Sequence, residues 1–213
     1  MTLSSAARLL EALRLLEQAI ERDPRYGPAL SYAALCCHRL LLGSEDPEVL
    51  AVAAFVIGIR GDDTDVAVSL VDRALALNPS FALGWYWSGV LRVAAGYPDL
   101  ALEHFETFLR LSPRERPSSH LTGIGMALFM KRRFEEAAAK LVESLEQAPN
   151  FTISLRYLAA CHAHLGRLDE ARDVVARLRA ITPVTMPTGT VSRDPEQREL
   201  LLSGLRLAAS EES

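Results

Sequence analysis

The sequence predicts an all-α protein, a solenoid of antiparallel helical hairpins with a capping helix at its C-terminal end. Two observations carry this prediction. First, an Ala, a bulky apolar residue four positions later and a Pro eight positions after that recur five times. Second, the five prolines are separated by 55, 34, 36 and 34 residues, and a period near 34 residues is typical of stacked helical hairpins. The matches are Ala12/Leu16/Pro24, Ala67/Val71/Pro79, Ala101/Phe105/Pro113, Ala137/Leu141/Pro149 and Ala171/Val175/Pro183.

Each part of this spacing has a physical role. The Ala and the bulky residue share one helix face, where the small side chain lets a neighbouring helix approach and the large one fills the gap. The Pro ends the helix because it has no N–H to donate. A partner helix is expected before each of these helices, and we predict the breaks between the two at Gly61, Gly96, Lys131 to Arg133 and Gly166.

One unit carries the pattern of a known family. The tetratricopeptide repeat has the consensus W-x2-L-G-x2-Y, then A-x3-F, then P. Trp85, Gly89, Ala101, Phe105 and Pro113 match this consensus in place, whereas Ser88 and Arg92 depart from it. The chain therefore resembles this family over about residues 6–183, and the resemblance implies a tetratricopeptide-type α-solenoid. Regular repeats are expected at about 48–79, 82–113, 118–149 and 152–183.

The ends of the array depart from this regularity. The first interval exceeds one repeat by 21 residues, about one helix with its turn, so the region near 25–47 is an irregular three-helix packing or a trimmed repeat. A trimmed repeat is favoured because residues 43–47 form a short cap. The solenoid is expected to span 1–183, with a loop at 184–192 and a capping helix and tail at 193–213. Solenoids need a terminal cap with a polar outer face.

Composition indicates an ordinary folded protein. Of the 213 residues, 49% are hydrophobic and 23% are charged, and the net charge of -4 gives no reason to expect nucleic acid or an anionic membrane as partner. Three cysteines, Cys36, Cys37 and Cys161, cannot all pair, which favours a reducing compartment. Charged residues interrupt the apolar pattern of the first 18 residues, so a secretory signal is not expected. These features predict a cytoplasmic protein without a membrane span.

No motif indicates catalysis or a cofactor. Cys161, His162 and His164 offer metal ligands, but on a helix the two histidines point about 200° apart. The chain has neither a phosphate-binding G-x-x-x-x-G-K nor a dinucleotide-binding G-x-G-x-x-G. We therefore expect no enzyme activity, no metal and no cofactor.

A second, looser resemblance covers the whole chain. Segments such as VDRALALNPSFALGW and LRYLAACHAHLGRLDEA, and the ending GLRLA, are similar to the C-terminal repeat region of bacterial class III adenylate cyclase-like proteins and related winged-helix regulators. The resemblance implies that such repeats sit behind a catalytic or DNA-binding domain and serve regulation. No such domain is expected in this chain. The resemblance therefore suggests the regulatory pathway in which the chain acts, and does not imply cyclase or DNA-binding activity.

The tetratricopeptide resemblance also implies where a partner binds. In this family the first helices of successive units line a concave groove, and the family's contact positions are mostly apolar in this sequence. Members of the family that hold a terminal carboxylate use Lys, Arg and Asn at these positions. Here only Arg60 and Arg156 are of these types, so a carboxylate clamp is not expected. Tyr86, Val90, Met126, Phe129 and Met130 are predicted to form one exposed apolar strip. The predicted groove residues are Val52, Val56, Tyr86, Val90, Met126, Phe129, Met130 and Arg156.

These features favour a non-catalytic protein-interaction module that binds an apolar helix or extended segment in its groove, in bacterial cytoplasmic signalling. The alternative is a detached or truncated regulatory region of a cyclase-like or transcription-regulating protein, whose groove packs against a missing domain. A third interpretation is self-assembly through the open N-terminal end of the solenoid. The implied partner is another protein or domain.

Overall fold

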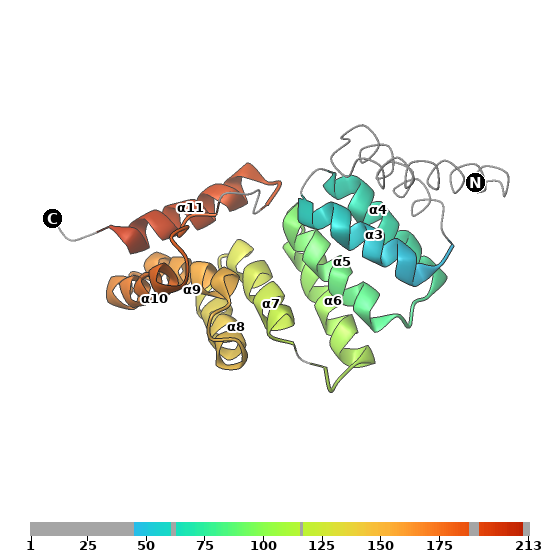
Figure 1. Cartoon of the computed structure of the whole chain (residues 1–213), viewed down its shortest axis with the longest axis horizontal. Coiled ribbons are helices and arrows are strands. Elements are labelled where there is room, and N and C mark those ends of the chain that lie inside the picture. The colour runs from blue at the N-terminus through green and yellow to red at the C-terminus, as the bar shows by residue number, and fades with distance from the viewer. Residues whose placement is uncertain (1–44, 61–62, 116, 188–191, 211–213) are drawn as a thin grey trace, which may run out of the picture.

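The computed structural model describes residues 45–60, 63–115, 117–187 and 192–210. Within these ranges the chain forms helices and no strands, as the sequence predicts (Figure 1). The helices are α3 (Pro47–Arg60), α4 (Thr64–Leu77), α5 (Ala82–Ala95), α6 (Pro98–Leu111), α7 (Ser118–Met130), α8 (Phe134–Gln147), α9 (Thr152–His164), α10 (Leu168–Ile181) and α11 (Pro195–Ala209). The predictions for residues 25–47, Cys36, Cys37 and the N-terminal end lie mostly or wholly outside the described residues.

Successive helices pair as hairpins: α3 with α4, α5 with α6, α7 with α8 and α9 with α10. Each second helix ends two residues before the proline of its repeat. The intervening residues Asn78, Ser112 and Ala148 have ψ angles of 88°, 70° and 80°. These angles lie outside the helical region because the ring of a following Pro clashes with a helical residue before it.

Three of the four predicted helix breaks are confirmed. Gly96 and Gly166 have φ angles of 86° and 75°, the left-handed conformation that Gly adopts at low cost. At the break between α7 and α8, Arg132 takes the same conformation with φ 58°. The fourth break, at Gly61, falls outside the described residues, between the end of α3 and the start of α4.

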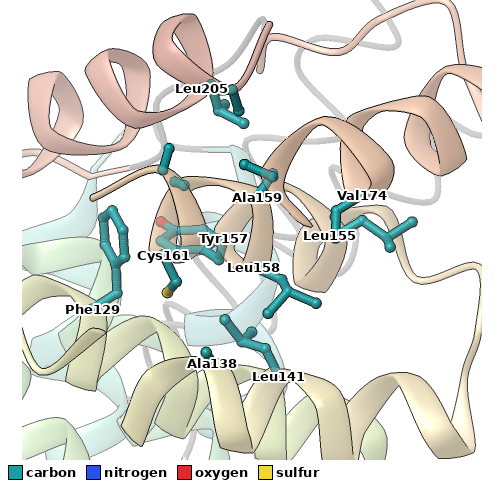
Figure 2. Packing of buried hydrophobic residues seen from close by; sticks show 14 of the residues in the cluster. Phe129, Ala138, Leu141, Leu155, Tyr157, Leu158, Ala159, Cys161, Val174 and Leu205 are labelled. Atoms are coloured by element: carbon teal, nitrogen blue, oxygen red, sulfur yellow. The ribbon is translucent and has the colours of Figure 1, made fainter. Parts of the chain in front are cut away.

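The recurring Ala and its bulky partner form the core, as their spacing predicts. Ala67, Ala101, Ala137 and Ala171 are all fully buried. Their partners Val71, Phe105, Leu141 and Val175 are at most 3% exposed. These side chains belong to clusters that run from one hairpin into the next, and Figure 2 shows part of the cluster between α7 and α11. The first match, at residues 12–24, lies outside the described residues.

The last helix packs differently from the first helices of the repeats. In the repeats, a first helix contacts the preceding second helix more extensively than the preceding first helix, as α9 does with α8 and α7. Helix α11 does the reverse and lies mainly along α9, with a smaller contact to α10. The residues between Ile181 and Pro195 give the chain length to reach this position. Helix α11 thus lies on the side of the first helices, rather than only over the end of the stack (Figure 1).

Candidate binding groove

The first helices of the hairpins line a cavity of about 570 Å³ that is open to solvent on one side. Helices α3, α5, α7 and α9 each contribute side chains to its wall, and two further residues, Pro187 and Leu201, come from beyond the last repeat. Apolar and aromatic side chains predominate in this wall. The groove, as we use the word below, is this cavity and the helix faces around it. Its lining includes Phe55, Tyr86, Val90, Val93, Met126, Ile153, Arg156 and Tyr157.

The cavity brings together four of the eight residues predicted for the groove. Tyr86 and Val90 come from α5, Met126 from α7 and Arg156 from α9. Their common placement follows from the repeat, because equivalent positions of successive first helices face the same side of a solenoid.

Val52 and Val56 on α3 do not line the cavity. Both are exposed, by 46% and 53%, and lie one helical turn apart. A spacing of four residues puts them on one face of the helix. They form an apolar strip on α3 that is separate from the cavity wall.

The predicted exposure of Phe129 and Met130 is wrong. Phe129 is fully buried and Met130 is only 5% exposed. The ring of Phe129 meets Tyr157 edge to face at 5.2 Å between centroids and lies 5.3 Å from Phe134, so it fills space between α7, α8 and α9 (Figure 2). Met130 packs in the cluster of Phe105. Both residues are in the last turn of α7, where the helix is packed against neighbouring helices.

The Tyr86 side chain both lines the cavity and packs against the hydrophobic core. Its ring lies 5.6 Å from Phe108 and 6.5 Å from His120, between centroids. Burial raises the pKa of its hydroxyl, and a hydrogen bond with Ser119 opposes this rise. These contacts hold the ring in one orientation. Tyr86 therefore presents a fixed aromatic surface to the cavity.

Arg156 does not offer a free cation to the groove. Its Nη2 donates to the carbonyl of Val184 at 2.7 Å, and its Nε donates to the carbonyl of Thr185 at 3.0 Å. Nη1 lies 3.4 Å from the hydroxyl of Thr152. Burial lowers the pKa of the guanidinium, which stays charged because its ordinary pKa exceeds 12. The side chain binds backbone carbonyls of its own chain.

Sequence reasoning missed several lining residues. Phe55 on α3 and Tyr157 on α9 are aromatic residues on first helices that line the cavity. Each is the sequence neighbour of a predicted groove residue, Val56 and Arg156 respectively, and was not itself predicted. Pro187 and Leu201 also line the cavity, but they follow the last repeat, so the repeat pattern could not predict them. Only the course of the chain after α10 brings them to the cavity.

The candidate metal ligands do not converge. Among the described residues, no group of three His, Cys, Asp or Glu side chains could hold a metal ion. Cys161 is buried, and burial raises the pKa of its thiol to about 12. His164 Nε2 lies 2.8 Å from the carbonyl oxygen of Leu200, and its ring stacks on Phe134. In the same part of the chain, no helix has the length and apolar character needed to cross a bilayer.

The hairpins, their period and the groove define a helical repeat protein of the kind that binds other proteins or peptides. A family model of the tetratricopeptide repeat matches residues 59–119 and 122–184, more than half of the chain. The chain therefore belongs to the tetratricopeptide repeat family, which is in general a non-catalytic scaffold. No curated protein matches the chain.

Solved structures share the fold at low sequence identity. A tetratricopeptide repeat protein from Parabacteroides merdae is 14% identical with a TM-score of 0.60, covering 97% of this chain and 94% of that one. MamA from Desulfovibrio magneticus is 19% identical with a TM-score of 0.56, covering 80% and 94%. YrrB, a tetratricopeptide protein with an unusual peptide-binding site, is 22% identical with a TM-score of 0.52, covering 91% and 90%. At these identities the likeness concerns the fold alone.

Proposed function

We propose that this chain is a non-catalytic interaction module whose groove binds an apolar helix or extended segment of another protein. The observation that carries the proposal is the apolar cavity of about 570 Å³ between the first helices of successive repeats. Ligand cavities commonly measure about 300–1,000 Å³. A cavity of this size takes a few side chains of a partner, whose backbone would lie across α5, α7 and α9.

Two residues are the proposed anchors of this binding. Tyr86 is already held by Phe108 and His120, so binding costs little additional side-chain entropy. Met126 is unbranched and partly buried, so it can adapt to side chains of different shape. Together they suit an amphipathic segment that inserts apolar residues from one face. Val52 and Val56 are a proposed extension of this surface along α3.

The proposed setting is bacterial cytoplasmic signalling. The looser resemblance to the repeat region of adenylate cyclase-like and winged-helix regulators supports it, and similar folds occur in proteins of Parabacteroides merdae and Desulfovibrio magneticus. The peptide-binding site named for YrrB supports a peptide-like partner. Self-assembly through the N-terminal end is a further proposal for the same module.

The alternative function rests on the same looser resemblance. In it, the chain is a detached regulatory region of a cyclase-like or transcription-regulating protein, and the groove packs against that protein's other domain. A neighbouring reading frame that encodes such a domain, and binding between the two products, would favour the alternative.

A peptide selection tests the proposed groove. The immobilised chain would be used to select from a displayed library of random peptides, and the affinities of selected peptides would be measured by fluorescence polarisation. Met126→Glu places a charge at the cavity wall and should weaken binding at least tenfold, which is about 1.4 kcal/mol. Leu100→Glu is the matched control, because Leu100 is exposed on the second helix α6 and does not line the cavity.

The comparison has a clear negative result. Selected peptides that bind Met126→Glu as tightly as the wild type would overturn the groove proposal, and so would an equal loss with Leu100→Glu. Far-ultraviolet circular dichroism of both variants ensures that a loss of binding is not a loss of folding.

A further inference from the structure

Two described segments that follow α10 contact the groove side of the solenoid. We call residues 182–187 and 192–209 the C-terminal strap. Its first part is held by Arg156, which donates to the two consecutive carbonyls of Val184 and Thr185. Pro187 then lines the cavity. The strap thus enters the groove at the fourth hairpin, on the helix that carries Arg156.

The second part of the strap is bound two hairpins away, at the end of α5. The backbone N–H of Arg193 donates to the carbonyl of Ala94 at 2.9 Å, and Ala94 itself lines the cavity. The Arg193 guanidinium pairs with Asp65, with Nη1 2.5 Å from Oδ2. Asp194 lies against Gly96, where an added Cβ would be 3.3 Å from the Cβ of Asp194. The first part of the strap therefore contacts α9, and its second part contacts the end of α5.

Arg193 takes a place in a series of ion pairs between repeats. In two repeats, the acidic residue at the second position of the second helix forms an ion pair with a basic residue 32 positions later. The pairs are Asp99–Lys131 and Glu135–Arg167, and in each the basic residue lies in the turn between the two helices of the next repeat. The equivalent acid, Asp65 on α4, has Tyr97 at that distance. Arg193 supplies the missing cation from the strap. The strap thus binds an acid that the repeat sequence leaves without its usual cation.

Helix α11 completes the strap and lies on α9. Asp194 Oδ1 accepts from the backbone N–H of Glu196 and caps the helix. Leu201 is 1% exposed and lines the same cavity as Tyr86 and Met126. Gly204 lets the helices approach closely, since an added Cβ would be 2.8 Å from the Cβ of Ala160. A bound partner that extends beyond the cavity would therefore contact α11.

The strap is held unevenly. Helix α11 buries Leu200, Leu201, Leu205 and Ala208, each at most 8% exposed. By contrast, the side chains of Arg193 and Asp65 are 59% and 74% exposed, and ion pairs in water contribute little. The contact with α5 therefore opens more readily than the contact of α11 with α9.

From these contacts we propose that the C-terminal strap is an intramolecular occupant of the groove side and regulates it, so that a partner must displace the strap to bind fully. This inference rests on the proposed function, because it names what competes for the same site. The strap shows the chemistry that the groove accepts: backbone carbonyls facing Arg156, followed by an amphipathic helix with Leu201 at the cavity.

The test measures whether a separate peptide with the sequence of the strap binds to full-length variants of the protein. The probe is a fluorescein-labelled peptide of residues 192–210. In Gly204→Leu, the new side chain collides with Ala160 and should release α11 without changing any repeat. The labelled wild-type peptide should bind Gly204→Leu at least tenfold more tightly than it binds the wild-type chain, whose own strap occupies the site. Arg206→Leu is the matched control, since Arg206 is exposed on α11, and should bind like the wild type.

Two further probes separate the parts of the strap. A peptide carrying Arg193→Glu should bind Gly204→Leu severalfold more weakly, because it faces Asp65 with a like charge. Leu205→Ala, which removes buried contact instead of adding bulk, should also admit the wild-type peptide. Amide hydrogen exchange on each full-length variant should show faster exchange in α11 with α5 and α7 still protected. This readout also confirms that the repeats are folded.

The outcomes distinguish the strap from the groove. Equal peptide affinity for the wild type and both release variants would overturn the strap proposal, as would α11 exchange as slow in both variants as in the wild type. A third outcome is that selected library peptides bind Met126→Glu more weakly than the wild-type protein, but bind Gly204→Leu with the same affinity as the wild-type protein. This outcome would support the groove function and overturn the regulation by the strap. Tighter trans binding of the strap peptide, with no library peptide sensitive to Met126→Glu, would overturn the groove function and, with it, the regulation by the strap, although α11 would still pack against the repeats.

Discussion

The ring of Phe105 lies directly against the backbone of Gly123, where an added Cβ would be 2.5 Å from Cζ of the ring. A Cβ on Gly89 would likewise be 2.5 Å from Cε1 of the same ring. Phe105 comes from α6, while Gly89 and Gly123 belong to α5 and α7. The bulky residue of the repeat is thus accommodated by the absence of side chains on both neighbouring first helices.

Gly123→Ala is therefore expected to destabilise the protein. In an open helix, Ala stabilises relative to Gly by about 1 kcal/mol. Here the new methyl group forces the buried ring to move, and such overpacking costs about 1–3 kcal/mol. Urea unfolding should give a lower midpoint for Gly123→Ala than for the wild type.

A double-mutant cycle isolates this contact. Adding Phe105→Leu removes the ring atoms nearest to residue 123, so the Gly123→Ala substitution should cost less in that background. A midpoint that rises in Gly123→Ala alone would contradict the close contact.

The burial of Phe129 gives a second prediction. Phe129→Ala leaves a cavity between α7, α8 and α9 and should cost about 3–5 kcal/mol. Val56→Ala removes an exposed side chain on α3 and should change the free energy of unfolding by less than about 0.5 kcal/mol. Urea unfolding compares the two. A similar small loss in both variants would contradict the packing of Phe129 against Tyr157 and Phe134.

The sequence predicted the repeat because the repeat is local. Spacing along one helix determines which residues share a face, so Ala101 and Phe105 could be assigned to the core. The same counting assigned Phe129 to the groove, and there it failed. In the last turn of α7 its ring turns toward Tyr157, on the next first helix, which spacing within α7 cannot reveal.

The strap could not be predicted for a different reason. Its contacts join residues that no repeat relates, such as Arg193 and Ala94, 99 positions earlier in the sequence. The sequence indicated a capping helix within residues 193–213, and α11 begins at Pro195 with Asp194 as its N-cap. Which helices it covers depends on the path of the connection after α10, where no periodic pattern exists.

Two departures from the repeat consensus pair with each other. Ser88 and Arg92 are both on α5, and Arg92 Nη1 donates to Ser88 Oγ at 2.6 Å. Arg92 Nη2 also pairs with Asp72 at 2.7 Å. Ser88 Oγ lies 2.9 Å from Nδ1 of His104 and can donate its proton there. Side chains that broke the consensus therefore form one polar cluster between α4, α5 and α6.

Ser88→Ala tests this cluster as a third prediction. Ser88 is fully buried, so the substitution removes the hydroxyl that Arg92 Nη1 and His104 Nδ1 contact, while the bond between Arg92 Nη2 and Asp72 remains. The expected loss of unfolding free energy is about 1–3 kcal/mol, the usual cost of an unsatisfied buried polar group. Ser80→Ala is the control because Ser80 is exposed. Equal stability of the two variants in urea would show that the cluster contributes nothing.

The fourth prediction concerns the pH dependence of stability. The pKa of His104 is lowered to about 4, chiefly by burial and also by the neighbouring positive charge of Arg92, against the opposing effect of Asp72. In the unfolded chain the same histidine has its ordinary pKa of about 6.5. Between these two values the unfolded state binds the proton and the folded state does not. This contribution to stability is complete above about pH 6.5 and is lost as the pH falls toward about 4.

His104→Asn removes this titration and keeps a group that can bond to Ser88. The free energy of unfolding of the wild type should therefore fall more steeply than that of the variant between about pH 7 and pH 4.5, as measured by urea unfolding at each pH. His162, whose pKa burial also lowers, is present in both proteins, so its effect cancels in the difference. Parallel pH curves would mean that His104 titrates alike in both states, because only a pKa difference between the folded and unfolded chain can separate the curves.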